Sequence, residues 1–307
     1  MNLRLPHPVM LWVEPSAACN LDCPECPTAA GRQSGQMRLA DFTRILDQSP
    51  WLKFLNLWHR GEPLAAADFP DMVEAATRRG IYTQTHSNGI LLSRRDLAER
   101  LVEARLGRVA IGVDGSDEAT YLQIRHGGSL AEVEAGIRAL VDARRRRRSK
   151  RPRIIAECLV SRQPPEQFRA VKRLALEWGC DEVKFKTFRV PHPEDVEGSL
   201  ALLPDNPRLW RYELRDGKLA MKRRRAGCHR LTYSAVVAYN GEVYPCCFWV
   251  HGFMGMGNCF SQPLVEVWRG DPLRDFQRTV AANRDSIPMC RNCTEGLGRL
   301  YVKEGRL

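Results

Sequence analysis

Six short runs of apolar and β-branched residues, separated by amphipathic stretches, restrict the fold of this chain more than any other feature. The runs are Val9–Val13, Phe54–Trp58, Ile81–Thr85, Arg108–Val113, Arg153–Val160 and Glu182–Phe188. The clearest helix between them follows a capping box at Ser129–Glu132 and carries Val133 and Ile137 on its apolar face. Strands that alternate with helices predict a parallel α/β sheet with right-handed crossovers, either open or closed into a barrel.

The composition excludes several other classes of protein. Of the 307 residues, 44% are apolar and 27% are charged, which excludes a disordered or fibrous chain. No run of 18 apolar residues occurs, so no membrane-spanning helix is expected. Near the start only Val9–Val13 is apolar, which is too short for a signal peptide before Cys19. We therefore predict a cytoplasmic protein that does not engage a membrane.

Most of the eleven cysteines fall into two groups. An odd count, in a chain large enough to bury a core, argues against a disulfide framework and favours metal ligands. The first group, Cys19, Cys23 and Cys26, directly follows the first predicted strand, and no fourth Cys or His follows within about thirty residues. Structural zinc takes four ligands, whereas three thiolates on a [4Fe–4S] cube leave one iron open. The spacing therefore favours a cluster over zinc.

The spacing of Cys19, Cys23 and Cys26 resembles the cluster motif of the radical S-adenosylmethionine (SAM) enzymes. In that family the open iron binds SAM, and the fold is a partial (β/α)6 TIM-like barrel. Further motifs fall after successive predicted strands, so that in a parallel barrel they gather at one mouth. By resemblance, the SAM-binding residues are Gly61, Glu62, Pro63, Ser87, Asn88, Asp114, Arg125 and Leu159.

The resemblance also implies a role for each motif. Glu62 and nearby backbone carbonyls would hold the SAM ammonium, Arg125 and the ends of the third and fourth strands would surround the methionine carboxylate and ribose, and Leu159 would contact adenine. Two residues depart from the family pattern: Glu25 stands where an aromatic residue is usual, and Gly112 where a serine is usual. Neither departure removes a cluster ligand, so only the finer contacts to SAM are affected.

The second group of cysteines resembles part of the SPASM extension of radical SAM enzymes, which binds auxiliary clusters. Its well-placed members match the shorter, single-cluster version called a twitch domain: Cys228, Cys246, Cys290 and Cys293. Four cysteines with a C-x2-C pair also suit a zinc ribbon, but beside a radical SAM domain an auxiliary [4Fe–4S] cluster is favoured. Cys247 is an alternative to Cys246. The remaining cysteines are predicted to be small core residues: Cys158, Cys180 and Cys259.

These motifs predict a radical SAM barrel at 9–190, a linker without clear periodicity at 191–226, and an auxiliary cluster domain at 227–295. The resemblance implies an enzyme in which the reduced first cluster cleaves SAM to a 5′-deoxyadenosyl radical that takes a hydrogen atom from a substrate C–H bond. The second cluster would accept an electron, giving a net oxidation. Lys184, Lys186 and Arg189 are candidates for the base that takes the proton, with solvent-facing charge as the simpler interpretation.

The sequence constrains the substrate less than the chemistry. Only 18 residues precede Cys19, fewer than the peptide-recognition domain that peptide-modifying relatives often carry. We therefore expect a small molecule such as a sugar or an aminocyclitol, with modification of a ribosomally made peptide or of RNA as alternatives.

The net charge of +11 comes largely from basic runs at 144–153 and 222–225. We interpret these first as solvated surface, next as a docking site for an acidic flavodoxin or ferredoxin, and last as a nucleic-acid site. A non-catalytic zinc protein is the alternative from another class.

Overall fold

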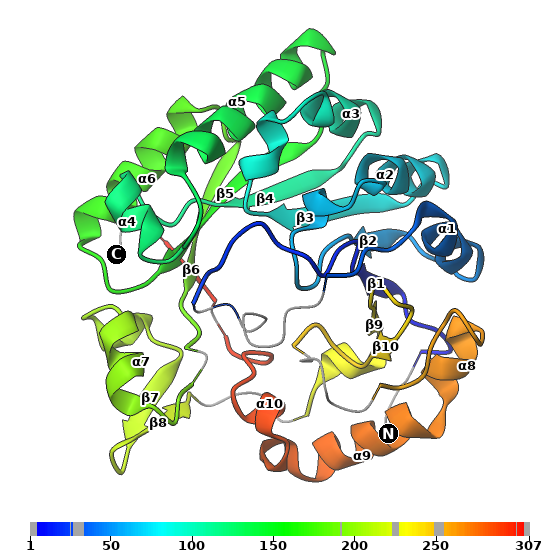
Figure 1. The fold of residues 1–307 in the computed structure, drawn as a ribbon. Coiled ribbons are helices and arrows are strands. Elements are labelled where there is room, and N and C mark those ends of the chain that lie inside the picture. The colour runs from blue at the N-terminus through cyan, green and yellow to red at the C-terminus, as the bar shows by residue number, and fades with distance from the viewer. Residues whose placement is uncertain are drawn as a thin grey trace.

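The computed structural model describes residues 5–24, 26, 34–190, 192–222, 227–248, 255–298 and 300–303. Its centre is a curved nine-stranded sheet in the order β10-β9-β1-β2-β3-β4-β5-β6-β11 (Figure 1). Six parallel strands follow chain order within it: β1 Met10–Val13, β2 Phe54–Asn56, β3 Tyr82–Ser87, β4 Arg108–Gly112, β5 Arg153–Val160 and β6 Glu182–Thr187. Each lies within two residues of a predicted run, and the predicted α/β fold class is confirmed.

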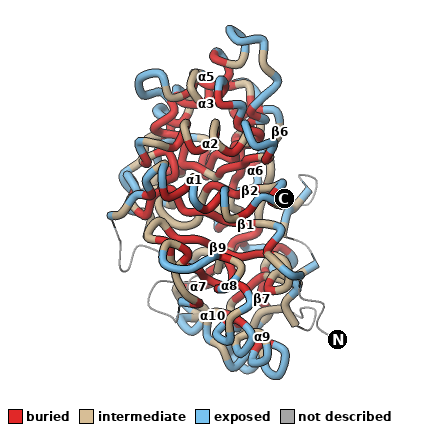
Figure 2. Tube along the Cα trace, turned by 90° about the vertical axis from the view of Figure 1, so that its right-hand side faces the viewer, coloured by how far each residue is buried: buried red, intermediate tan, exposed pale blue. Residues whose placement is uncertain are grey.

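Helices join these strands and cover the outer face of the sheet (Figure 1). They are α1 Leu39–Asp47, α2 Phe69–Arg78, α3 Leu97–Glu103, α4 Glu118–Leu122, α5 Leu130–Arg146 and α6 Pro165–Glu177. Helix α5 begins as predicted, because the Ser129 side chain accepts a hydrogen bond from the Glu132 backbone N–H at 3.5 Å. The apolar faces of these helices meet the sheet in one continuous core, which Figure 2 shows as the buried middle of the molecule.

Three further strands extend the sheet at both of its edges, and the sequence pattern did not predict them. Strand β9, Ser234–Val237, pairs in parallel with β1, and β10, Val243–Tyr244, pairs antiparallel with β9. At the opposite edge β11, Tyr301–Val302, pairs antiparallel with β6. Strands from the last third of the chain therefore pair with both outer strands of the barrel, β1 and β6.

The segment predicted as a linker contains regular structure in its described part. Helix α7, Val196–Leu202, precedes a hairpin of β7, Tyr212–Arg215, and β8, Lys218–Met221. These elements have a small core of their own, formed by Phe188, Val190, Leu203, Tyr212 and Leu219. Residues 191 and 223–226 lie outside the described residues, and the predicted domain boundaries stay a prediction.

The remaining helices lie near the second cysteine group. Three helices follow residue 227 in the described part of the chain: α8, Leu264–Arg269, α9, Asp271–Asn283, and α10, Pro288–Arg291. Short 3-10 turns complete the chain: η1 Pro63–Ala65, η2 Ile90–Ser93, η3 Pro207–Leu209, η4 His229–Thr232 and η5 Arg284–Ser286. None of the helices in the described ranges is long and apolar enough to cross a bilayer.

Candidate active site

The first cysteine group lies on the loop that follows β1. Cys19 is exposed, whereas Cys23 and Cys26 are half-buried. The loop is held by short-range bonds: the Leu21 N–H donates to Cys19 Sγ at 3.4 Å, and the Cys26 N–H donates to the Cys23 carbonyl at 3.1 Å. Partial desolvation of the Cys19 thiol raises its pKa, and the bond from the Leu21 N–H opposes that rise. Residue 25, where the family pattern has an aromatic side chain, lies outside the described residues.

The loop after β2 docks directly onto the backbone that precedes Cys19. The Glu62 N–H donates to the Ala18 carbonyl at 2.7 Å. A Cβ atom at Gly61 would lie 2.4 Å from the Ser16 carbonyl oxygen and 2.5 Å from that of Ala18, so only glycine permits this approach. Pro63 is buried and begins the 3-10 turn η1. The predicted residues of this motif therefore meet the cysteine loop.

The Glu62 carboxylate fixes the turn after β3. Its Oε1 atom accepts from Ser87 Oγ at 2.8 Å and from the Leu64 N–H at 3.1 Å, and its Oε2 atom accepts from the Asn88 N–H at 2.8 Å. Burial raises the pKa of Glu62, and these three donors oppose that rise. Because this chain's own donors bond both oxygens, contact of the carboxylate with the SAM ammonium stays a prediction.

Asn88 ties the same turn to the cysteine loop. Its side-chain amide donates to Asn20 Oδ1 at 2.8 Å, while its own Oδ1 accepts from the Ile90 N–H at 3.1 Å. The loops after β1, β2 and β3 thus form one bonded unit at the carboxyl end of the sheet, where a parallel barrel places its active site.

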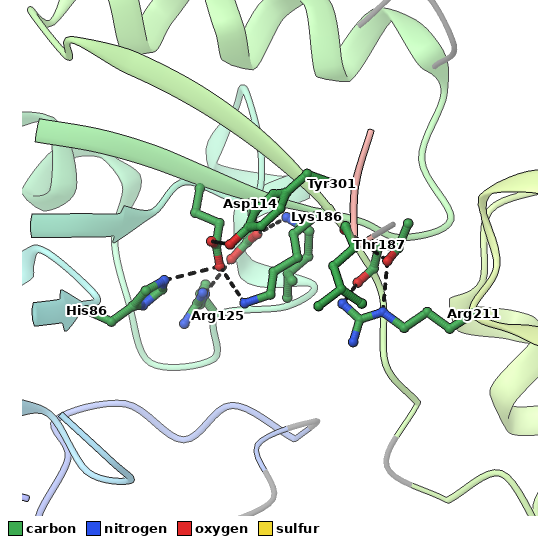
Figure 3. Close-up of polar contacts among 10 residues, drawn as sticks. His86, Asp114, Arg125, Lys186, Thr187, Arg211 and Tyr301 are labelled. Atoms are coloured by element: carbon green, nitrogen blue, oxygen red, sulfur yellow. Dashed lines mark hydrogen bonds and ion pairs between the residues drawn. The ribbon is translucent and has the colours of Figure 1, made fainter. Parts of the chain in front are cut away.

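The loops after β4 and β5 add a buried ion pair to this unit (Figure 3). Arg125 Nε donates to Asp114 Oδ2 at 2.6 Å, and the Leu159 N–H donates to Asp114 Oδ1 at 2.7 Å. Burial alone would lower the pKa of Arg125, but the charges of Asp114 and Cys23 outweigh it and raise that pKa. Arg125 also bonds the Cys23 thiol, which offsets part of the rise that burial causes in the pKa of Cys23. Arg125 therefore stands as a permanent cation beside a predicted cluster ligand.

The departure at Gly112 has a structural reason. A Cβ atom there would lie 2.3 Å from the Arg125 Nη2 atom. A side chain at residue 112 would require the end of Arg125 to shift, so Gly112 allows the present position of the guanidinium beside Cys23.

A second group of polar residues lines the inner face of the sheet, and the motif analysis missed its centre. Glu157, in the middle of β5, accepts from Lys186 Nζ at 3.0 Å and from Tyr301 OH at 3.1 Å, and His86 Nε2 lies 3.1 Å from it (Figure 3). Burial would raise the pKa of Glu157, but His86 and Lys186 hold it well below its usual range. One carboxylate in an apolar run carries no motif, so only the fold identifies Glu157.

The predicted base candidates differ in their surroundings. Lys186 is bonded to Glu157, and Lys184 Nζ lies 3.5 Å from Glu182 Oε1 and over the ring of Tyr301. Arg189 lies farther along the chain, over the Phe248 ring at 5.4 Å. Of the three, only Lys186 joins the inner polar group directly, and a base role for any of them stays a prediction.

The second cysteine group gathers between β9, β10 and α10. Cys246 and Cys290 are packed in one buried cluster with Cys228 against it. Burial raises the pKa of Cys246 well above its ordinary value, and the nearby thiols of Cys247, Cys293 and Cys228 raise it further. The four predicted ligands are therefore close together, and Cys247 lies with them.

The other cysteines lie elsewhere. Cys259 is buried in the main core, and its carbonyl accepts from the Gln48 side chain of α1 at 3.3 Å. Cys158 and Cys180 are buried in the same core, as the sequence predicted.

Comparison with family models identifies the two cysteine-containing parts of the chain. Residues 13–154 match the model of the radical SAM superfamily, and residues 228–294 match SPASM, an iron–sulfur cluster-binding domain. This chain belongs to the radical SAM superfamily. The matched ranges contain both cysteine groups and every loop of the bonded unit described above except the residues around Leu159.

Three relatives of this radical SAM protein resemble most of its length. The tungsten-containing aldehyde ferredoxin oxidoreductase cofactor-modifying protein of Pyrococcus furiosus is 26% identical over 92% of this chain and 86% of its own. The PqqA peptide cyclase of Streptomyces rochei is 24% identical over 94% and 82%. The structure of Streptococcus suis SuiB bound to precursor peptide SuiA has a TM-score of 0.68 at 17% identity, covering 94% of this chain and 70% of SuiB. SuiB has also been solved bound to SAM.

The radical SAM and SPASM domains carry SAM and [4Fe–4S] clusters as cofactors, and the residues of this chain fit them. A [4Fe–4S] cube takes one thiolate at each iron. The loop after β1 supplies three thiols for such a cluster, and the second group supplies four with Cys247 beside them.

The larger basic run of this radical SAM protein lies far from its cysteine loop. Residues 144–153 precede β5, whereas Cys19 follows the end of β1, so the two lie at opposite ends of parallel strands. The eight residues of β5 alone span about 25 Å at roughly 3.3 Å each. Several arginines of the run are paired, for example Arg144 with Asp181 at 2.6 Å and Arg146 with Glu99 at 3.0 Å. An electron donor docked on this surface would sit at the wrong end of the barrel.

Proposed function

We propose that this protein is a radical SAM enzyme that takes a hydrogen atom from a C–H bond of a peptide and so modifies it after translation. The observation that carries the peptide is the likeness to a PqqA peptide cyclase over 94% of this chain, with the SPASM domain included. SuiB, which was solved with its precursor peptide, shares the fold over the same share of the chain. A peptide is thus better supported than the sugar or aminocyclitol that the sequence favoured.

In this proposal Cys19, Cys23 and Cys26 would hold the cluster that binds SAM, and these cofactors would supply the radical that takes the hydrogen atom. The chain itself supplies position and charge. The unit of Glu62, Ser87 and Asn88 fixes the loops around the SAM site, and Arg125 holds positive charge beside Cys23. The bonded group of His86, Glu157 and Lys186, on strands β3, β5 and β6, would orient polar groups of the substrate.

Deuterium transfer tests the proposal. Anaerobically reconstituted enzyme, SAM and reduced flavodoxin or ferredoxin are incubated with deuterated peptides encoded beside its gene, and 5′-deoxyadenosine is analysed by mass spectrometry. We expect deuterium in 5′-deoxyadenosine and a mass change in the peptide, and neither in the Cys23→Ala variant. Deuterium transfer from an aminocyclitol or from the cofactor of another enzyme, but from no peptide, would overturn the peptide assignment. The second of these outcomes would match the Pyrococcus furiosus relative.

A further inference from the structure

The outer edge of β6 is only partly covered in the part of the chain that the structure describes. Within the described residues only β11 pairs with it, through Tyr301 opposite Lys186 and Val302 opposite Phe185. The Thr187 N–H also donates to the Leu300 carbonyl at 2.8 Å. The first half of β6, from Glu182 to Lys184, has no strand on this edge in the part of the chain that the structure describes. An uncovered strand edge is a template for pairing with another chain.

Strand β11 brings the hydroxyl of one half-exposed side chain to the inner polar group. The Tyr301 hydroxyl donates to Glu157 Oε2 at 3.1 Å, and the Lys184 ammonium lies 5.6 Å from the centre of its ring (Figure 3). Burial and the nearby Glu157 raise the pKa of Tyr301 to about 12, so its hydroxyl stays a donor. The tyrosine is thus bonded to the inner polar group.

Strand β11 is held by its short ladder, by two bonds from Thr187 to the Leu300 carbonyl, and by Val302 against the main core. It is two residues long, and Tyr301 remains 48% exposed. Each hydrogen bond of such a short ladder contributes little net stability, because water replaces it when the strand leaves. An extended peptide can make the same backbone bonds to β6, which is how peptides add to sheet edges in general.

We propose that the edge of β6 is a docking site for an extended peptide, which pairs antiparallel in place of β11 and puts one side chain where Tyr301 lies. The side chain that this position accepts is aromatic and carries a hydrogen-bond donor, because Glu157 accepts a bond there and Lys184 covers the ring. Strand β11 then acts as an internal competitor that the substrate displaces. This inference rests on the proposed function only for the identity of that substrate.

The ladder itself supplies a test variant. Leu300 and Thr187 form a hydrogen-bonded pair, and such pairs alternate in antiparallel ladders, so Val302 is the next hydrogen-bonded position. Val302→Pro removes the N–H that this position needs. Val302→Ala keeps it and is the matched control.

The probe is a fluorescent heptapeptide with the sequence of residues 297–303, Leu-Gly-Arg-Leu-Tyr-Val-Lys. Its binding to anaerobically reconstituted enzyme is measured by fluorescence anisotropy. We expect Val302→Pro, and a chain shortened after Gly298, to bind it at least about tenfold more tightly than the parent and Val302→Ala. Replacing tyrosine by phenylalanine in the probe should weaken binding about tenfold, because a hydrogen bond to a charged carboxylate is lost.

Hydrogen exchange supplies a second readout in the full-length chain. The Phe185 amide should exchange faster in Val302→Pro than in Val302→Ala, and the heptapeptide should slow it again. Equal binding of the heptapeptide and a scrambled sequence by both open variants would overturn the docking site. The binding assay needs no turnover, so the two proposals can fail separately. If the β6 edge binds peptide but no peptide is modified, this inference stands and the proposed function fails. If a peptide is modified but the β6 edge does not bind it, the proposed function stands and this inference fails.

Discussion

A single methyl group at Gly61 tests whether the SAM site depends on close contact between the loops after β1 and β2. A Cβ atom in Gly61→Ala would lie 2.4 Å from the Ser16 carbonyl oxygen, whereas ordinary van der Waals contact begins at 3.4 Å. The two backbones must therefore separate by about 1 Å. The bond from the Glu62 N–H to the Ala18 carbonyl, now 2.7 Å, would lengthen to about 3.7 Å and be lost.

The overpacking and the lost hydrogen bond both lower the stability of the site, and the displacement lowers the rate of the reaction. Overpacking of this size costs about 1–3 kcal/mol and the lost hydrogen bond about 1 kcal/mol more. A displacement of about 1 Å in a reacting site can reduce the rate about 100-fold. Since all three cysteines of the first group remain, we expect Gly61→Ala to keep the iron of the first cluster but to cleave SAM about 100 times more slowly.

The assay compares iron content, SAM affinity by calorimetry and the rate of 5′-deoxyadenosine release under reducing, anaerobic conditions. Gly255→Ala is the control, because a Cβ atom at Gly255 meets nothing within 4 Å. Should Gly61→Ala cleave SAM at the rate of the Gly255→Ala variant, the close approach of the two loops would have no role in positioning SAM.

Three further predictions concern charge and metal content. Asp114→Asn leaves the mostly buried Arg125 without its ion partner, so we expect it to lower stability by about 3 kcal/mol, seen as a drop in Tm, and to weaken SAM binding. Cys228→Ala should lower the iron content by about four atoms per chain and leave SAM cleavage measurable, whereas Cys259→Ala should leave the iron content unchanged. Arg148→Glu should leave the rate of reduction by flavodoxin unchanged. If the variant is instead reduced more slowly, and high salt slows reduction of the parent protein in the same way, the basic run is the docking site.

Much of the fold was predictable because its central strands are buried on both faces. Runs such as Arg153–Val160 are apolar almost throughout, and a parallel strand under helices requires this. Strands β10 and β11 are two residues long and have no periodicity to detect. The linker prediction missed the β7–β8 hairpin for the same reason, since four-residue strands carry only two inward side chains each.

The candidate site was predictable where a motif follows a strand and hidden where tertiary contact assembles it. Gly61 and Asn88 stand in short motifs after strands, and the structure places them against the cysteine loop. The inner group joins His86, Glu157 and Tyr301 from three elements up to 215 residues apart, and no local pattern links them. The sequence shows that Gly112 replaces the serine usual in the family, but the space that it leaves for Arg125 is seen only in the structure.

The pairing of β9 with β1 has a consequence for how the protein is made on the ribosome. Strand β2 is complete once Asn56 has been synthesised, but the other edge of β1 stays unpaired until Val237 at the end of β9 is made, 181 residues later. At about 5–20 residues per second, translation leaves that side unpaired for roughly 10–35 seconds. During this interval one edge of an apolar strand is open to pairing with other chains, so the nascent chain carries a site for misassembly until β9 is made.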